Sequence, residues 1–233
     1  MKKVLSLILT LILVLSTFTP AFGASSEREL YKESGEILKN LGVLQGSGTG
    51  DLMLDKKLKR QDMVVLVSRL HKEENTAKKF LAINAFTDVK DPYYKPYISW
   101  AVDKGLIVGT GQNKFGFNNP VTVQQFQTLL LRALGYHEEA KNWNNVPDFA
   151  KSLKLMEGLS TTSKQEVDRG LMAAMTVNAL RLTKSGSSMT LAQHLNLDIP
   201  DLFKVDAVAT VDRNTLKLEG VATGTHALKV NLK

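Results

Sequence analysis

One pattern recurs along this chain, and it limits the possible fold more than any other feature. The apolar turn Lys104–Gly109 (Lys-Gly-Leu-Ile-Val-Gly) has an earlier counterpart in Leu41–Gly46 (Leu-Gly-Val-Leu-Gln-Gly), at an offset of 63 residues. In both places a predicted helix precedes the turn, and a turn-rich loop and a second helix follow it. The sequence therefore predicts repeated helix–loop–helix units rather than one irregular domain.

The second helix of the middle unit has the clearest start. Thr122, with Gln125 three residues later, predicts a capping box. The apolar residues that follow share one face of a helix: Phe126, Leu129, Leu130, Ala133 and Leu134. In the first unit, the helix after Lys59–Asp62 has an equivalent face, formed by Met63, Leu66, Val67 and Leu70.

A third, weaker copy follows the second. Its turn is Lys154–Gly158, and Asp168 is predicted to cap a helix whose inward residues are Met172, Met175, Thr176, Ala179 and Leu180. Before the turn, an amphipathic helix is predicted with Trp143, Val146, Phe149, Ala150 and Leu153 on one face, interrupted early by Pro147. Since one unit alone has too little apolar surface to fold, we expect the three units to share a core.

The chain begins with the three-part pattern of a secretory signal peptide. Lys2 and Lys3 precede an apolar run, Val4–Leu15, and the small residues Ala21 and Gly23 mark a cleavage site. The run is shorter than the roughly 20 residues that span a bilayer. We therefore predict an exported protein with no membrane attachment after cleavage of residues 1–23.

The last 36 residues differ in character from the rest. Short apolar alternations on both sides of a polar turn at Asp212–Asn214 predict two or three β-strands. The predicted division is a signal peptide (1–23), three repeats (27–80, 81–140 and 141–197) and a β-rich segment (198–233). This segment is either a small appended sheet or the start of a longer, truncated domain.

Composition excludes several functional classes. The 233 residues are 43% hydrophobic and 23% charged, which fits a folded globular protein. The chain has no cysteine and only four scattered histidines, so no metal site is predicted. No catalytic constellation or cofactor motif is recognised, and we predict no enzyme. The net charge of +7 suits a polyanionic partner, and export disfavours nucleic acid.

The middle unit strongly resembles an S-layer homology repeat. The resemblance rests on Phe86–Val89, Trp100-Ala101, Gly105–Gly109 and Phe117–Thr122. It implies a mainly α domain in which three repeats form a pseudo-threefold spindle. It also implies binding to the anionic, pyruvate-bearing secondary cell-wall polysaccharide that is attached to peptidoglycan, and retention of an exported protein at the bacterial surface. The alternative function is a structural subunit of a surface lattice, whose partners are other surface-layer proteins.

The family's local motif, Thr-Arg-Ala-Glu at the start of the second helix, is incomplete in every copy. It is replaced by Lys59–Asp62, Thr122–Gln125 and Asp168–Leu171. Two copies keep the arginine, as Arg60 and Arg169, whereas Val123 stands in the middle one. The resemblance therefore implies up to two charged glycan pockets. A guanidinium at a helix N-terminus suits a carboxylate, since it can bind both carboxylate oxygens.

The candidate glycan-binding residues are Arg60, Arg169, Gly46, Gly109, Trp100 and Asp88. Each also has an ordinary structural interpretation. The arginines could be surface residues in solvent, and the glycines could serve turns or helix ends. The Trp100 ring could pack in the core instead of against a sugar, and Asp88 could tighten the turn before its helix.

Overall fold

A computed structural model describes residues 22–81, 86–200, 204–212 and 215–223. The chain divides into two compact units, one ending at Asn196 and the other beginning at Leu197. Nearly all of the predicted signal peptide lies outside the described residues. Among the helices that are described, none is long and apolar enough to cross a membrane.

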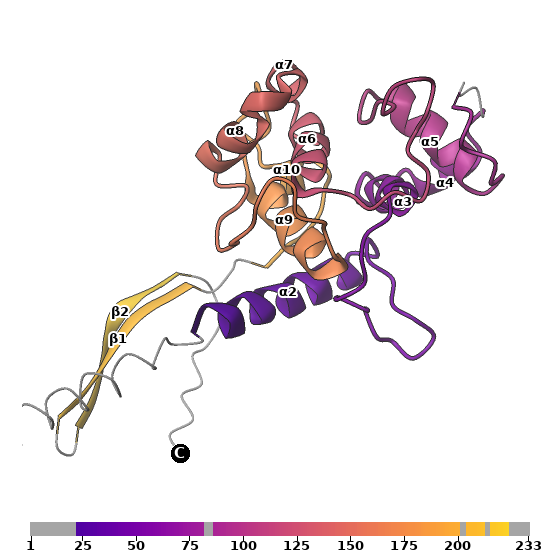
Figure 1. The fold of residues 1–233 in the computed structure, drawn as a ribbon. Helices are drawn as coiled ribbons and strands as arrows, with labels where there is room; N and C mark the ends of the chain where they lie inside the picture. The colour runs from indigo at the N-terminus through magenta and orange to yellow at the C-terminus, as the bar shows by residue number, and fades with distance from the viewer. Residues whose placement is uncertain (1–21, 82–85, 201–203, 213–214, 224–233) are drawn as a thin grey trace, which may run out of the picture. The chain divides into compact units, whose positions relative to one another are not determined.

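The elements described in the first unit are helices joined by loops (Figure 1). Its elements are α2 (Phe22–Asn40), α3 (Arg60–Leu70), α4 (Glu74–Lys78), α5 (Tyr94–Asp103), α6 (Val123–Ala133), α7 (His137–Lys141), the short 3-10 helix η1 (Trp143–Asn145), α8 (Val146–Ser152), α9 (Arg169–Arg181) and α10 (Leu191–His194). The second unit contains β1 (Lys204–Asp212) and β2 (Thr215–Thr223). These strands pair antiparallel, with Lys204 opposite Thr223 and Asp212 opposite Thr215. The third predicted strand, near residues 227–232, lies outside the described residues.

Two predicted helix starts are confirmed. Thr122 accepts a hydrogen bond from the Gln125 N–H, and the Gln125 side chain accepts one from the Thr122 N–H, which completes the capping box. Asp168 accepts a hydrogen bond from the Leu171 N–H at 2.9 Å. The residues predicted to face inward on α3, α6 and α9 are all buried.

The predicted role of Pro147 is wrong. Pro147 lies in the first turn of α8 and begins this helix instead of interrupting it, because the first turn does not need its missing N–H. The residues before it, Trp143–Asn145, form the separate η1. Trp143 is therefore off the predicted helical face and is 48% exposed.

The helices α3, α6 and α9, called here the second helices, are joined just before their first turns by a closed ring of backbone hydrogen bonds. Leu58 N–H donates to the Val167 carbonyl, Val121 N–H to Leu58, and Val167 N–H to Val121, at 2.8–3.0 Å. All three side chains are buried. The ring gives the three second helices equivalent starting points, so residues at the same distance from it can be compared directly.

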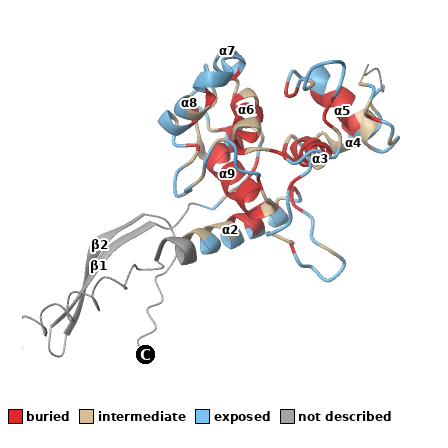
Figure 2. Ribbon diagram, viewed as in Figure 1, coloured by how far each residue is buried: buried red, intermediate tan, exposed pale blue. Residues whose placement is uncertain are grey.

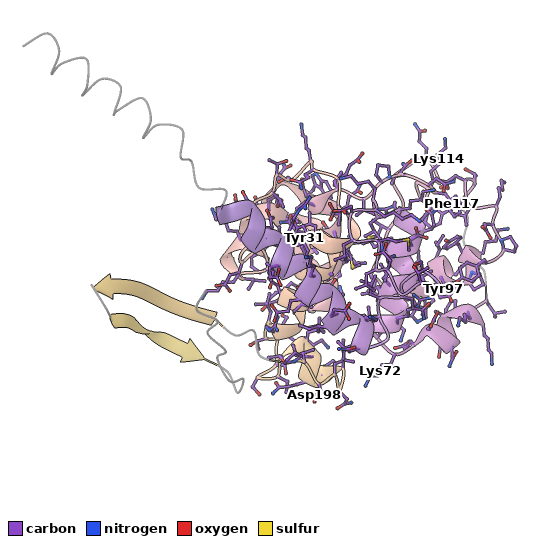
Figure 3. All side chains as sticks on the ribbon, turned by 90° about the horizontal axis from the view of Figure 1, so that it is seen from below. Tyr31, Lys72, Tyr97, Lys114, Phe117 and Asp198 are labelled. Carbon is purple, nitrogen blue, oxygen red and sulfur yellow. The ribbon has the colours of Figure 1, made fainter. Side chains whose placement is uncertain are left out.

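Each remaining long helix packs on a second helix from a different repeat. The helix α5 contacts α3, α8 contacts α6, and α2 contacts α9, which returns the end of the unit to its beginning (Figure 1). At Gly170 in α9 an added Cβ would lie 2.8 Å from the Tyr31 ring of α2, so only glycine permits this approach. Tyr31 is labelled on α2 in Figure 3. The helix α9 is buried along its length, on all sides rather than on one face (Figure 2).

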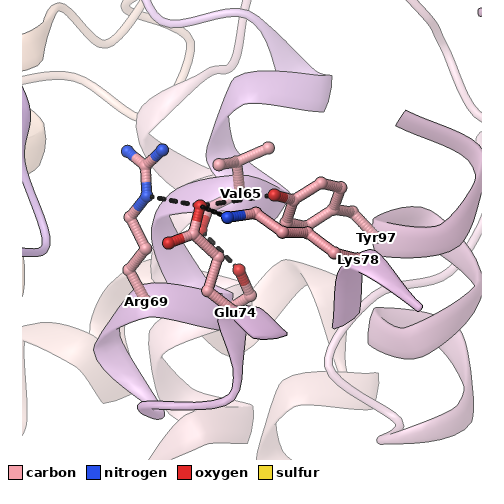
Figure 4. A network of polar contacts seen from close by, with 6 residues as sticks. Val65, Arg69, Glu74, Lys78 and Tyr97 are labelled. Carbon is pink, nitrogen blue, oxygen red and sulfur yellow. Dashed lines mark hydrogen bonds and ion pairs between the residues drawn. The ribbon is translucent and has the colours of Figure 1, made fainter. Parts of the chain in front are cut away.

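Polar contacts fix the corner between α3, α4 and α5 (Figure 4). Glu74 Oε1 receives Arg69 Nε at 3.1 Å, Lys78 Nζ at 3.4 Å and the Tyr97 hydroxyl at 3.3 Å. The preceding acid, Glu73, accepts from the Trp100 indole N–H at 3.0 Å. Two adjacent carboxylates therefore join the short α4 to both neighbouring helices.

His71, at the end of α3, makes the stability of this corner depend on pH. Its ring is largely buried against the edge of Trp100, and Nε2 has no hydrogen-bond partner. Burial lowers its pKa below 6.5; Glu73 opposes this effect, whereas Lys104, Lys184 and His194 add to it. The unfolded chain therefore binds a proton more readily than the folded protein does.

We expect His71 to cost folding stability as the pH falls through 6.5. The free energy of unfolding keeps its full value above pH 6.5, and it falls as the pH approaches the lowered pKa of His71 in the folded state. Denaturant unfolding at pH 7.5, 6.5 and 5.5 should show this slope in the wild type and a smaller one in His71→Gln. The same substitution at the exposed His137 is the control. Equal slopes in the wild type and His71→Gln would contradict the assignment.

Candidate functional site

The strongest candidate site is a groove between α3 and α6, called here the α3/α6 groove. Its volume is about 460 Å³, within the range of small-molecule sites. Three cationic side chains line it, Arg60 from α3, Arg132 from α6 and Lys141 from α7, together with the half-exposed Trp143. Among the described residues that line the groove there is no carboxylate.

Arg60 has a structural role as well as a place in the groove. Its Nε donates to the Phe115 carbonyl at 2.6 Å, and a terminal nitrogen, Nη2, donates to the Val108 carbonyl at 2.7 Å. The guanidinium also lies 5.1 Å from the centre of the Phe115 ring. A guanidinium has five N–H donors, so these two contacts leave donors for a ligand.

Arg169 repeats this contact pattern one unit away. Its Nε donates to the Leu52 carbonyl at 2.8 Å, and Nη2 donates to the Gln45 carbonyl at 2.6 Å. The two acceptors lie 63 residues before those of Arg60. Arg60 therefore holds the loop of the second predicted unit, and Arg169 holds the loop of the first. Neither is a free surface arginine, as the alternative interpretation expected.

Positive charge in the α3/α6 groove is costly without an anion. The pKa of Arg60 is lowered to about 10, mainly by burial and also by the neighbouring charge of Arg132, against the weaker opposing effect of Asp88. Burial also lowers the pKa of Arg132, whose Nη1 donates to the Leu106 carbonyl at 3.3 Å. Both shifts favour a bound negative group that would offset the two charges.

Asp88 holds the loop of residues 115–117, next to the α3/α6 groove. Its carboxylate accepts N–H bonds from Phe115, Gly116 and Phe117 at 2.8–2.9 Å. Burial raises the Asp88 pKa, but these three hydrogen bonds outweigh that effect and lower it overall. Asp88 thus fixes the loop whose carbonyl receives Arg60, and it acts as a positioning residue, in agreement with the turn-tightening interpretation.

Gly46 and Gly109 are required by close backbone approach. An added Cβ at Gly109 would lie 2.6 Å from the Lys114 carbonyl oxygen, and one at Gly46 would lie 2.8 Å from that of Asp51. Gly109 also lines the α3/α6 groove. The structure gives both glycines a turn role, and Gly109 in addition borders the candidate site.

Trp100 does not reach the groove. Its side chain is fully buried, and its N–H bonds to Glu73, so the core-packing interpretation describes it and no ring face is open to a sugar. The exposed indole near the cationic groove is that of Trp143 instead. Sequence analysis missed Trp143 because it assigned the residue to a helical face, and it missed Arg132 because the residue lies outside the four-residue motif. The sequence did contain a signal for Arg132. Arg69 lies nine residues after Arg60, and Arg132 lies nine residues after Val123, the equivalent position of the next copy.

Comparisons with known proteins find one matching domain family and several similar surface proteins. Residues 85–126 match the model of the S-layer homology domain. The chain is 29% identical over 193 residues to the middle cell wall protein of Brevibacillus brevis, and 26% identical over 191 residues to the surface layer protein of Brevibacillus choshinensis. It is also 26% identical over 190 residues to a cell surface protein of Thermoanaerobacter kivui.

These relatives are much longer than this chain. Each alignment covers 78% of the chain but only 17–25% of the relative. The matched domain and the relatives point to the cell wall or cell surface as the location of the protein. The family match falls on the middle copy, whose motifs are the most complete, and the repeat character of the other two copies stays a prediction.

Proposed function

We propose that this protein is a cell-wall anchoring module that binds an anionic, pyruvylated polysaccharide and holds an exported protein at the bacterial surface. The observation that carries the proposal is the α3/α6 groove, in which three cationic groups and an exposed indole meet without a lining carboxylate. A pyruvate ketal presents a planar carboxylate, which a guanidinium can bind through two parallel hydrogen bonds. In this proposal the half-exposed Trp143 ring, which also lines the groove, stacks on a sugar face.

The proposed architecture is a pseudo-threefold arrangement of three repeats after a signal peptide. The closed ring of Leu58, Val121 and Val167 supports it, as do the matching contacts of Arg60 and Arg169. In this arrangement the α3/α6 groove lies between the second helices of two repeats, so this glycan site is a property of neighbouring repeats. A single repeat cut from the chain would contain no complete groove.

Co-sedimentation with purified peptidoglycan sacculi tests the anchoring function. We expect the mature protein to sediment with intact sacculi and to lose most of this binding after the attached polysaccharide is stripped. Sacculi from cells that lack the pyruvyl groups should bind as weakly as stripped ones. Equal binding to intact and stripped sacculi would contradict the proposal, and self-association without glycan would favour the lattice-subunit alternative.

Substitutions on the exposed side of the groove test the site without disturbing the fold. Trp143→Ala and Lys141→Gln should each weaken binding of a pyruvylated disaccharide by about three- to tenfold, since each removes about 1 kcal/mol of stacking or charge attraction. Tyr93→Ala is the matched control for the exposed ring, and Lys39→Gln for a lysine that pairs with a glutamate three residues away. Calorimetric affinities that do not differ from those of the controls would remove this groove from the proposal.

A further inference from the structure

A second groove, lined by α6, α8 and the loop of residues 154–163 and called here the α6/α8 groove, differs chemically from the α3/α6 groove. Its volume is about 530 Å³. Two lysines line it, Lys151 and Lys154, but so do two acids, Asp148 and Glu157. The formal charges of these four side chains cancel, whereas the charged side chains that line the α3/α6 groove are all cationic.

The change in charge follows from three positions on the second helices. At the first position, α3 and α9 have Arg60 and Arg169, and α6 has Val123. At the tenth position, α3 and α6 have arginines, and α9 has Asn178, whose amide donates to the Leu155 and Glu157 carbonyls. The α6/α8 groove is lined by Val123 at the first position of α6, and no arginine is among the described residues that line it.

One helical turn after Val123, α6 has a polar residue, Gln127. At the equivalent position α3 has Val64 and α9 has Ala173, and both are fully buried and apolar. Gln127 is 3% exposed, lines the α6/α8 groove, and has a buried Oε1 atom without a hydrogen-bond partner. Such an unpaired buried acceptor destabilises the folded protein. A ligand donor would remove this destabilisation.

An amide and an apolar wall suit a neutral ligand. Rotation of the Gln127 side-chain amide presents its oxygen as an acceptor or its NH₂ group as a donor. Val123, Met156 and Leu159 supply apolar lining near it. An acetamido group has the complementary features, an N–H donor, a carbonyl acceptor and a methyl group. A free carboxylate, in contrast, would find no guanidinium and would approach Asp148 and Glu157.

We propose that the α6/α8 groove binds an uncharged acetamido sugar through Gln127, in addition to the anion-binding α3/α6 groove. This inference rests on the proposed glycan-binding function, and it adds a second ligand class to it. The module would then bind a glycan at two chemically different points. Two linked contacts strengthen attachment beyond either one when the spacing of the glycan allows both.

Titration of the full chain with N,N′-diacetylchitobiose tests the proposal. We expect saturable binding to the wild type, at least tenfold weaker binding of cellobiose, which lacks the acetamido groups, and at least tenfold weaker chitobiose binding to Gln127→Val. Valine is the residue that α3 carries at this position. Unfolding stability should stay equal or rise in the variant, because the unpaired oxygen is gone, and this separates a lost contact from a damaged fold.

A comparison of Trp143→Ala with Gln127→Val separates this inference from the proposed function. Trp143→Ala should weaken binding of the pyruvylated disaccharide and leave chitobiose binding unchanged, whereas Gln127→Val should do the reverse. Residual binding to stripped sacculi that Gln127→Val removes would identify the peptidoglycan backbone as the source of the acetamido sugar; a loss on intact sacculi alone would identify the polysaccharide. Equal chitobiose affinity in Gln127→Val and the wild type, or no chitobiose binding beside normal anionic binding, would overturn the inference alone.

Discussion

Removal of residues 163–197 is expected to unfold the rest of the helical unit. This deletion takes away Val167, so the ring loses two of its three backbone hydrogen bonds. It also removes α9, which has eleven buried residues and is the packing partner of α2. Five of these residues have large apolar side chains. At about 1.5–3 kcal/mol for each of them, the loss is comparable with the 5–15 kcal/mol that stabilises a typical domain.

Circular dichroism and denaturant unfolding measure the effect of the deletion. The shortened protein should have little helix signal and no cooperative transition. Truncation after Pro200 is the control, because it leaves every residue of the ring and all of the second helices in place. A shortened protein that unfolds cooperatively, with a midpoint equal to that of the control, would contradict the idea that the three units share one core.

Arg60→Ala is expected to reduce both stability and anionic glycan affinity, and Arg169→Ala is expected to do the same. Each substitution leaves two backbone carbonyls without their guanidinium donor, which costs about 1.5–3 kcal/mol for each hydrogen bond from a charged group. Glycan affinity should fall by roughly 1.5–3 kcal/mol if the guanidinium also meets a carboxylate. The more buried Arg60 should show the larger loss of stability.

Lysine variants and two controls resolve the two effects. Arg→Lys at either position should recover only part of each loss, because an ammonium cannot reproduce the two-pronged contact. Val123→Ala should leave anionic glycan affinity within error, since valine offers no donor. Arg28→Ala, at an exposed position of α2, should change neither quantity. Unfolding curves and calorimetry on the same samples make the comparison, and unchanged stability in Arg60→Ala would contradict its loop-holding role.

Local signals in the sequence were enough to locate the second helices. A capping box acts over three residues and a helical face over about ten, so Thr122, Asp168 and the apolar periodicity predict α6 and α9 without any knowledge of the rest of the chain. The loss of an arginine at Val123 is also visible in the sequence once the repeats are aligned. Trp143 shows the limit of this approach, because its periodic spacing fitted a helix that actually starts three residues later.

The sequence by itself determined the starts of α6 and α9 and predicted the repeated units and the two surviving arginines, because these depend on residue types at short spacing. Only the tertiary structure decided that α2 packs on α9, that α9 is buried on every side, and that Arg132 faces Arg60 across a groove. These features arise when the ring of Leu58, Val121 and Val167 brings distant units together. Contacts between units depend on that closure, and no pattern within a single unit encodes them.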